Sequence, residues 1–304
     1  MFQSCQVPEP LVPGDVVRVI SPSGALRERD AFEAGLAVWR SRGYQVKLAE
    51  GYGDRWGYLA GTDVQRRQQL REAWADPDCK GILCARGGWG GARLLEDWRW
   101  AEPGQTLQPK WLIGFSDITS LLWSLGIQGV SGVHGPLLTT LAAEPEASVE
   151  RLFDWVERHD FQPLQGISWV EGQATGQLLP ANLTVATHLL GSTHQPPLQG
   201  VILALEDVGE APYRIDRMLT QWRLCGLLQQ VAGIAVGRFS QCEPPESVPS
   251  FSVEEVLRDR LCDLGVPVVA GLPFGHDGEN ATLPVGVPVT LDGTAGTLAL
   301  AQNG

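Results

Sequence analysis

Hydrophobic residues in the first half of the chain form short β-rich runs that alternate with stretches of helical spacing. In the helical stretches, apolar side chains recur three and four positions apart. Strands are predicted at residues 16–20, 45–48, 81–85 and 110–115, and helices at 29–42, 64–74, 92–98 and from 118 onward. This repeated strand–loop–helix order predicts an open, mostly parallel sheet with helices on both faces, a Rossmann- or flavodoxin-like α/β domain.

The second half of the chain has a mixed pattern. Strand-like runs at 201–205 and 231–236 flank a helical pattern over 213–228. A further helical pattern over 253–264 leads into a strand at 266–270, and short strands separated by Gly and Pro finish the chain. The pattern predicts a smaller, mixed α/β domain with a curled sheet.

The boundary between these domains is expected after the charged amphipathic helix predicted at 149–158. A stretch containing Pro, Gln and Gly follows it at 161–166. We therefore expect an N-terminal domain over residues 1–160 and a C-terminal domain over 168–304. A length of 304 residues, 43% of them hydrophobic, is enough for two buried cores and argues against intrinsic disorder.

The charge balance narrows the choice of partners. Lys and Arg number 23 against 35 Asp and Glu, which gives a formal net charge of −12. Such a chain is a poor partner for nucleic acid or an anionic membrane surface. No apolar run reaches the ~18 residues that a membrane span needs, and the N-terminus lacks the pattern of a signal peptide. We expect a cytoplasmic protein.

The cysteines and histidines give no sign of a metal site or of any cofactor. The six cysteines are scattered without a CxxC motif, and the five histidines form neither an HExxH motif nor a His/Cys cluster. We interpret the cysteines as small buried hydrophobic residues in a reducing compartment.

A candidate nucleophile stands where the predicted strand 110–115 meets the following helix. Ser116 occupies this tight turn, as the serine of a nucleophile elbow does. The N–H of Asp117 would then lie at a helix N-terminus, where it could face a developing oxyanion. The match is partial, because Ile118 stands where the elbow motif has a glycine. The alternative is that Ser116 or Asp117 simply caps the helix.

A glycine-rich loop at 86–91 also lies between a predicted strand and a predicted helix. Such a loop brings backbone N–H groups close to a ligand, since no Cβ blocks the approach. It matches neither GxxxxGK[ST] nor GxGxxG, because Arg93 stands where the last glycine should be. A second oxyanion donor, a phosphate cradle and a plain tight turn all remain open from the loop alone.

Two further strand ends carry candidate acid–base residues. Glu206, Asp207 and Glu210 follow an apolar strand, where a carboxylate could orient a histidine, although clustered acids also occur in solvated loops. His276 lies between glycines in a turn-rich loop expected to be exposed, and His134, also flanked by glycine, is the competing base. The order along the chain is serine, acid, histidine.

At these residues the chain resembles the LD-carboxypeptidase family of serine peptidases, which includes muramoyltetrapeptide carboxypeptidases and microcin C self-immunity enzymes. The resemblance covers nearly the whole chain. It is carried by the segments 21–24, 86–90, 114–119, 134–136, 182–184, 205–210, 213–217 and 273–276. Their order and spacing together are specific, although no single segment is.

The resemblance implies a catalytic triad of Ser116 as nucleophile, His276 as base and Glu206 as the residue that orients it. The serine would belong to the N-terminal domain and its two partners to the C-terminal one. Backbone N–H groups of Asp117 and of the glycine loop, where we choose Gly88, would form the oxyanion hole. We expect Arg86 to bind the terminal carboxylate of the substrate, with Trp89 as a packing wall, although Arg86 could equally form a structural ion pair.

The implied reaction is hydrolysis of an amide between an L-centre and a terminal D-residue, such as release of D-Ala from murein tetrapeptide in the cytoplasm during peptidoglycan recycling. A first alternative is an immunity-type peptidase that cleaves peptide–nucleotide conjugates, and a second is a non-catalytic nucleotide- or peptide-binding module. The partners expected are a small peptide and a second copy of the chain in a homodimer, with no nucleic acid or membrane.

Overall fold

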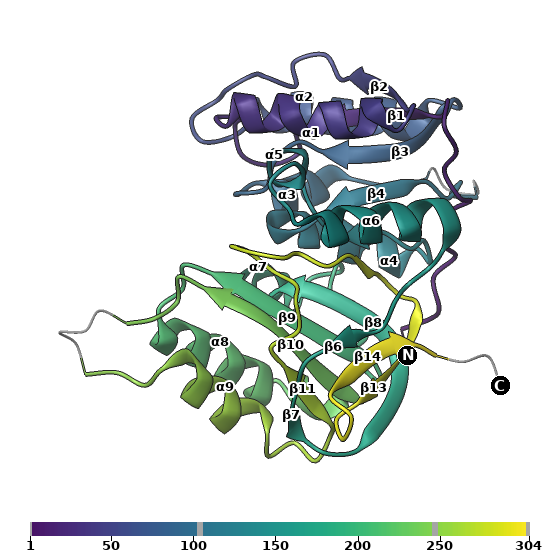
Figure 1. The fold of residues 1–304 in the computed structure, drawn as a ribbon. Helices are drawn as coiled ribbons and strands as arrows, with labels where there is room; N and C mark the ends of the chain where they lie inside the picture. Colours follow the sequence, from purple (N-terminus) through teal and green to yellow (C-terminus); the bar gives the residue numbers. More distant parts are fainter. Residues whose placement is uncertain (1, 102–105, 245–248, 302–304) are drawn as a thin grey trace. The chain divides into compact units, whose positions relative to one another are not determined.

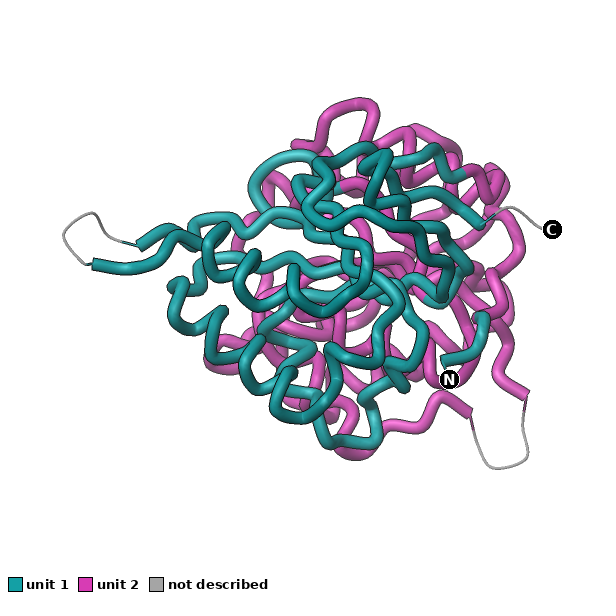
Figure 2. Tube along the Cα trace, turned by 90° about the horizontal axis from the view of Figure 1, so that it is seen from below, with its two compact units in different colours: residues 1–4, 161–280, 286–304 teal, residues 5–160, 281–285 magenta. Residues whose placement is uncertain are grey.

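The computed structural model describes residues 2–101, 106–244 and 249–301. The chain divides into two compact units, drawn in different colours in Figure 2. The N-terminal unit holds residues 5–160 and 281–285, and the C-terminal unit holds residues 1–4, 161–280 and 286–304. The division is therefore not contiguous, because a short segment from the second half of the chain belongs to the N-terminal unit.

The N-terminal unit is built on a six-stranded sheet with the strand order β12-β5-β4-β3-β1-β2. The strands are β1 (Val16–Ile20), β2 (Gln45–Leu48), β3 (Cys79–Cys84), β4 (Trp111–Gly114), β5 (Val133–His134) and β12 (Leu283–Pro284). All neighbours are parallel except β12, which pairs antiparallel with β5. The predicted open, mostly parallel sheet is confirmed, with β12 as an addition that the hydrophobic pattern did not indicate.

Helices cover both faces of this sheet (Figure 1). They are α1 (Arg29–Ser41), α2 (Asp63–Ala75), α3 (Gly91–Leu94), α4 (Thr119–Ile127), α5 (Leu138–Leu141) and α6 (Glu146–Arg158). Helix α1 contacts α5 and, through Trp39 against Phe153, also α6, whereas α2, α3 and α4 contact one another in turn. Helix α2 begins with a capping box between Thr62 and Gln65.

Two helix boundaries differ from the prediction. Helix α6 starts at Glu146, three residues before the predicted position, because Pro145 precedes it as the N-cap residue. The helix predicted at 92–98 is instead the single turn α3 followed by a 3₁₀ turn at Leu95–Asp97.

The C-terminal unit holds an eight-stranded mixed sheet with the strand order β6-β14-β13-β8-β9-β10-β11-β7. Its strands are β6 (Leu164–Gln165), β7 (Ile167–Val170), β8 (Gln173–Asn182), β9 (Ile202–Val208), β10 (Gly233–Ser240), β11 (Val268–Ala270), β13 (Pro288–Asp292) and β14 (Thr297–Leu300). Strands β8 to β11 are parallel in that order, and the remaining pairs are antiparallel.

The predicted curl of this sheet is confirmed, and its cause can be read from the strand order. Strands β6 and β7 stand at opposite ends of the sheet, yet only Gly166 separates them along the chain. The sheet must therefore curl until its two ends nearly meet. A Cβ on Gly166 would lie 2.5 Å from the carbonyl oxygen of Ala270, so the joint requires a glycine.

Helices α7 (Leu183–Leu189), α8 (Pro212–Leu224) and α9 (Val253–Leu261) belong to the same unit, and α8 lies beside α9 (Figure 1). Helix α8 ends four residues before the predicted position, because Gly226 adopts a positive φ of 66°. The strand predicted at 266–270 begins only at Val268, since Pro267 has no N–H for a ladder bond. The pattern indicated neither β8 nor α7.

The cysteines follow the prediction only in part. Cys5, Cys79, Cys84 and Cys242 are buried, but Cys225 is exposed and Cys262 is partly exposed, because both stand at helix ends. Burial raises the pKa of Cys5 to about 12 and that of Cys242 to about 11, so both remain thiols at neutral pH.

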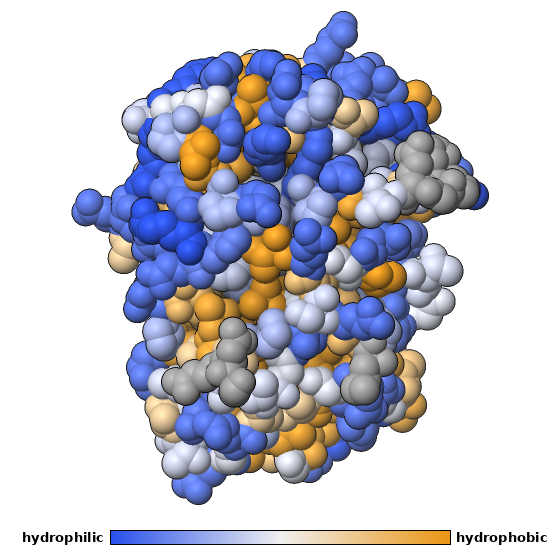
Figure 3. All heavy atoms as spheres, turned by 90° about the vertical axis from the view of Figure 1, so that its right-hand side faces the viewer, coloured by the Kyte–Doolittle hydropathy of each residue, from blue (hydrophilic) through white to orange (hydrophobic). Residues whose placement is uncertain are grey.

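Among the described residues, no helix combines the length and the apolar character that crossing a membrane requires. On the face drawn in Figure 3, hydrophobic residues occur in small groups among hydrophilic ones.

The close approach of α1 to α5 gives a stability prediction. A Cβ on Gly35 would lie 2.0 Å from the carbonyl oxygen of Leu138. Helix propensity alone would make Gly35→Ala stabilising by about 0.5–1 kcal/mol, but overpacking against backbone costs about 1–3 kcal/mol. We expect the thermal midpoint of unfolding to fall. Ala34→Gly, at an exposed position of the same helix, is the control for propensity. A rise in the midpoint of Gly35→Ala would show that the two helices are not in close contact.

Candidate active site

Ser116 lies in the sharp turn between β4 and the following helix. Strand β4 ends at Gly114, and a 3₁₀ turn at Ser116–Ile118 leads directly into α4. The φ angle of Ser116 is +62°, in the left-handed region that residues other than glycine rarely adopt. Such strain costs about 1–3 kcal/mol and persists only where the surrounding structure enforces it. This is the backbone geometry of a nucleophile elbow.

The glycine loop lies against this turn. A Cβ on Gly87 would stand 3.1 Å from the Cβ and 3.2 Å from the Oγ of Ser116, so only glycine lets the loop approach the serine without displacement. The N–H of Gly91 donates to Asp117 Oδ2 at 2.7 Å, which ties the far end of the loop to the residue after the serine. The N-terminal unit thus brings together Ser116, Asp117 and the loop that contains Gly88.

Arg86 and Trp89 come from the same loop. The guanidinium of Arg86 pairs with the Glu28 carboxylate, at 2.9 Å from Nε to Oε2 and 3.4 Å from Nη2 to Oε1. Partial burial of Glu28 acts to raise its pKa, but the hydrogen bond and the charge of Arg86, together with backbone N–H donors, outweigh burial and lower the pKa. Trp89 is 46% exposed, as a side chain that contacts a ligand would be.

Glu206 and His276 meet in the C-terminal unit. Glu206 lies within β9 and is 0% exposed, so it belongs to the sheet and not to a solvated loop. His276 Nδ1 lies 2.7 Å from Glu206 Oε2, and the His276 side chain is only 18% exposed, less than its turn-rich loop led us to expect. Because a carboxylate only accepts, Nδ1 carries the proton in this hydrogen bond. Nε2 is then the basic nitrogen of the neutral ring.

A second group of residues holds Glu206 in place. Asn182 Nδ2 donates to Glu206 Oε1 at 3.2 Å and to Asp207 Oδ1 at 3.0 Å. Asp207 Oδ2 in turn accepts from the N–H and the hydroxyl of Thr184. Asn182 and Thr184 belong to the family-like segment 182–184, but the sequence pattern indicates no role for either residue. Their position at the junction of an apolar strand and a helix was the available signal.

The loop that carries His276 is held against β10. The N–H of Arg238 donates to the Phe274 carbonyl at 2.8 Å, and the Ser240 hydroxyl donates to the His276 carbonyl at 2.6 Å. Gly275 has a φ of +119°, and a Cβ there would lie 3.1 Å from the Cβ of Glu206. The glycine before the histidine is therefore required by both its backbone conformation and its contact with the acid.

The electrostatics of His276 favour its protonated form. Burial acts to lower the pKa of the ring, but the hydrogen bond and the charge of Glu206, together with the charges of Asp207 and Asp277, raise it above 6.5. Burial has the opposite effect on a carboxyl group, and it raises the pKa of Asp207. His134, the competing base, is fully buried on β5 with its ring centroid 5.8 Å from that of Phe115.

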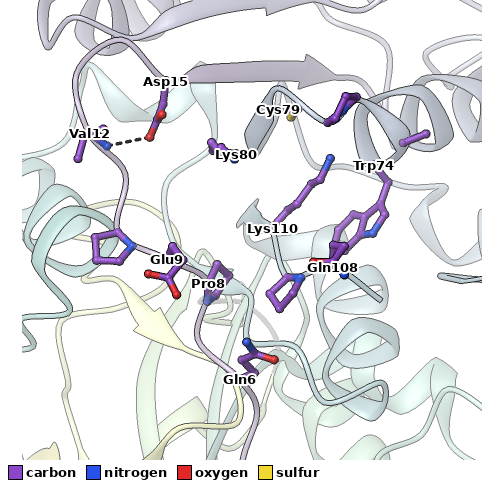
Figure 4. Close-up of a pocket in the computed structure, with 14 residues that line it drawn as sticks. Gln6, Pro8, Glu9, Val12, Asp15, Trp74, Cys79, Lys80, Gln108 and Lys110 are labelled. Carbon is purple, nitrogen blue, oxygen red and sulfur yellow. Dashed lines mark hydrogen bonds between the residues drawn. The ribbon is translucent and has the colours of Figure 1, made fainter. Parts of the chain in front are cut away.

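A cavity of about 640 Å³ in the N-terminal unit lies at the amino ends of the parallel strands, opposite the ends that lead to Ser116 and the glycine loop (Figure 4). Its lining residues include Asp15 and Lys110, which directly precede β1 and β4, and Cys79, which begins β3. Ser116 and Arg86 follow the carboxyl ends of β4 and β3, so this cavity holds none of the predicted site residues. Among the residues that the structure describes, no three His, Cys, Asp or Glu side chains form a metal-binding group.

Comparison with known proteins accounts for both units. The LD-carboxypeptidase N-terminal domain matches residues 17–135, and the LD-carboxypeptidase C-terminal domain matches residues 175–291. A Synechocystis protein whose name assigns it a carboxypeptidase activity is 60% identical to this chain over 292 residues, 96% of each chain.

The chain belongs to the LD-carboxypeptidase family. The murein tetrapeptide carboxypeptidase of Pseudomonas aeruginosa is 34% identical over 295 residues, 91% of this chain and 93% of that one. The microcin C7 self immunity protein MccF has the same fold, with a TM-score of 0.88 at 21% identity over 98% of this chain and 99% of that one. The family match and the carboxypeptidase relatives support a peptidase activity.

The pair of His276 and Glu206 predicts a titration. Because the pKa of His276 is raised, we expect its midpoint above 6.5 in the folded protein, followed by histidine NMR signals. The pair then adds stability that is fully present below pH 6.5 and is lost as the pH rises through the raised pKa. Glu206→Gln removes the charge, so the midpoint moves down. An unchanged midpoint would show that Glu206 does not act on His276.

Asn182 both donates to the two buried carboxylates and caps α7, and these two roles can be separated by mutation. Its Oδ1 accepts from the N–H of Val185 at the start of α7, while its Nδ2 serves the two carboxylates. Asn182→Ser keeps a capping oxygen and loses the Nδ2 amide group that donates to both carboxylates, which should cost about 1–3 kcal/mol. Asn182→Ala loses both, for about 1 kcal/mol more. Urea unfolding of both variants checks this, and a Ser variant as stable as wild type would contradict it.

Proposed function

We propose that the protein is a serine-type LD-carboxypeptidase that releases the terminal D-Ala from murein tetrapeptide. The observation that carries the proposal is the left-handed backbone of Ser116, which lies two residues after the end of β4 and against a glycine loop. A serine that acts as the nucleophile in acyl transfer makes use of such a strained turn, whereas a serine that only caps a helix does not need the strain. The buried pair of Glu206 and His276 supplies the acid and base that such chemistry requires.

In the first half of the proposed reaction, Ser116 Oγ attacks the carbonyl carbon of the penultimate residue. The hydroxyl proton passes to Nε2 of His276, whose Nδ1–H stays hydrogen-bonded to Glu206. The carbonyl oxygen becomes an oxyanion, for which the N–H groups of Asp117 and Gly88 are the proposed donors. The C–N bond then breaks, the proton on Nε2 moves to the departing nitrogen, and D-Ala leaves.

In the second half, water hydrolyses the acyl-enzyme. His276 takes a proton from the water, and the hydroxide attacks the ester carbon. The bond to Ser116 Oγ then breaks as His276 returns the proton to Oγ. Atoms and charges balance over the cycle, and the chemistry requires no metal or organic cofactor.

The choice of a murein substrate rests on the relatives. The Pseudomonas aeruginosa protein that matches along nearly its whole length is named for murein tetrapeptide. MccF shares the fold at an identity too low to carry its substrate over. A cytoplasmic location and a homodimer complete the proposal, and both rest on the family relationship.

The proposal predicts the outcome of a release assay with L-Ala-D-Glu-meso-diaminopimelate-D-Ala. Ser116→Ala and His276→Ala should lower D-Ala release by up to about 10⁶-fold, and Glu206→Gln by up to about 10⁴-fold. Ser41→Ala and His194→Ala, which replace the same residue types elsewhere, should retain wild-type release.

Two results would contradict this proposal in different ways. Release that survives in Ser116→Ala would exclude this serine as the nucleophile. A folded wild-type protein that releases no D-Ala, but whose Ser116 reacts with a fluorophosphonate, would be a serine hydrolase with another substrate. A peptidyl-adenylate analogue would then be assayed. Absence of both release and labelling would favour a non-catalytic binding protein.

A further inference from the structure

A shallow cavity of about 360 Å³ lies beside the glycine loop in the N-terminal unit. Its lining residues are Gly24, Arg27, Tyr58, Arg86, Gly88 and Trp89. They come from three segments, the loop after β1, the tight turn at 56–59 and the glycine loop after β3. Since Gly88 follows Gly87, which lies against Ser116, this cavity adjoins the proposed nucleophile within one unit.

One of the two arginines in the cavity is already held by the protein. A Cβ on Gly24 would lie 2.4 Å from Arg86 Nη1, and a Cβ on Gly88 would lie 2.6 Å from the same atom. The guanidinium therefore fits between two stretches of bare backbone, and Glu28 balances its charge. Gly24 N–H also donates to the Gly87 carbonyl at 3.0 Å. These contacts make Arg86 a support for the loop that carries the proposed oxyanion donor.

The second arginine is differently placed. Arg27 is exposed, and its guanidinium forms no hydrogen bond or ion pair with any residue in the described ranges. Glu28, the acidic neighbour that could neutralise it, is engaged by Arg86. Tyr58 and Trp89, which are 58% and 46% exposed, add two aromatic walls. The cavity thus offers one uncompensated positive charge in a protein whose net charge is −12.

The chemistry of a carboxypeptidase gives this charge a use. A carboxypeptidase must recognise a free carboxylate one residue beyond the bond that it cleaves, and a guanidinium binds a carboxylate through two parallel hydrogen bonds. A cavity of about 360 Å³ has room for one small amino acid residue. An arginine already paired with glutamate would have to give up that pair to bind the substrate.

We propose that Arg27 binds the terminal carboxylate of the leaving D-amino acid, and that Arg86, paired with Glu28, positions the glycine loop. This proposal rests on the proposed function and identifies the residue that recognises the substrate. It moves recognition of the carboxylate from Arg86, the residue that the sequence suggested, to a neighbour whose charge is available.

The test compares two tetrapeptides that differ only at the end, one with a C-terminal D-Ala carboxylate and one with the D-Ala carboxamide. A charge-assisted hydrogen bond predicts that wild type prefers the carboxylate in kcat/KM by about 10- to 100-fold. Arg27→Ala should abolish this preference, and Arg27→Lys should keep part of it. Arg40→Ala, which removes an exposed arginine from α1, is the matched control and should keep the full preference.

The positioning role of Arg86 has a separate readout. Glu28→Gln frees the guanidinium and loosens the loop, so kcat should fall by up to about 100-fold, the lower end of the loss of one oxyanion donor. KM for the carboxylate peptide should stay nearly constant. A higher KM with an unchanged kcat in Glu28→Gln would contradict the positioning role.

The outcomes separate this inference from the proposed function. A preference that persists in Arg27→Ala but disappears in Arg86→Ala would overturn it. If wild type released no D-Ala, the proposed function would be wrong. The affinities of the two peptides, measured by calorimetry with Ser116→Ala, would still decide the inference. A carboxylate preference that depends on Arg27 supports it there, and no preference overturns it.

Discussion

The burial of two adjacent carboxylates on β9 is the constraint on which the C-terminal half of the site depends. Glu206 and Asp207 are 0% and 2% exposed, and a buried charge left without donors would cost several kcal/mol. Neighbouring elements provide the donors: Asn182 ends β8, Thr184 lies in the first turn of α7, and His276 comes from the loop held by β10. The contacts that make the buried acids tolerable are therefore the same contacts that fix the imidazole ring and its tautomer.

In the N-terminal unit the corresponding constraint is crowding of the backbone. Gly87 lies against Ser116, where a Cβ would be 3.1 Å from the serine Cβ, and Gly24 and Gly88 lie on either side of the Arg86 guanidinium, where a Cβ would be 2.4 and 2.6 Å from Nη1. Ser116 is held at a positive φ beside them. A strained nucleophile needs a rigid support, and here that support is bare backbone packed around a neutralised arginine. The glycines thus contribute close approach more than flexibility, and the two units reach rigidity by different physical means.

Features set by local spacing could be predicted from the sequence, and features set by distant contacts could not. The turn at Ser116, the glycine loop and the parallel order of the N-terminal strands all follow from segments of about ten residues. Strand β8 was missed because Gln173 to Gly176 have no apolar alternation. Its first half pairs with β13, more than a hundred residues away, and its second half pairs with β9, about twenty residues away.

The role of Asn182 could not be predicted for the same reason, since its partners Glu206 and Asp207 come from another strand. The pairing of Arg86 with Glu28 links two loops 58 residues apart, so sequence reasoning left its two interpretations equally open.

The buried position of Glu206 also sets a limit on the base that it supports. A carboxylate at 2.7 Å strengthens His276 as a proton acceptor, but it also raises the pKa and so leaves less of the ring neutral near pH 7. Burial of the ring acts in the opposite direction and returns part of the neutral population. Exposing His276 would remove the effect of burial that keeps part of the ring neutral. Moving Glu206 away would make His276 a weaker proton acceptor. An acid that is wholly buried and a histidine that is mostly buried therefore form a compromise in which the base stays strong while a useful fraction remains unprotonated.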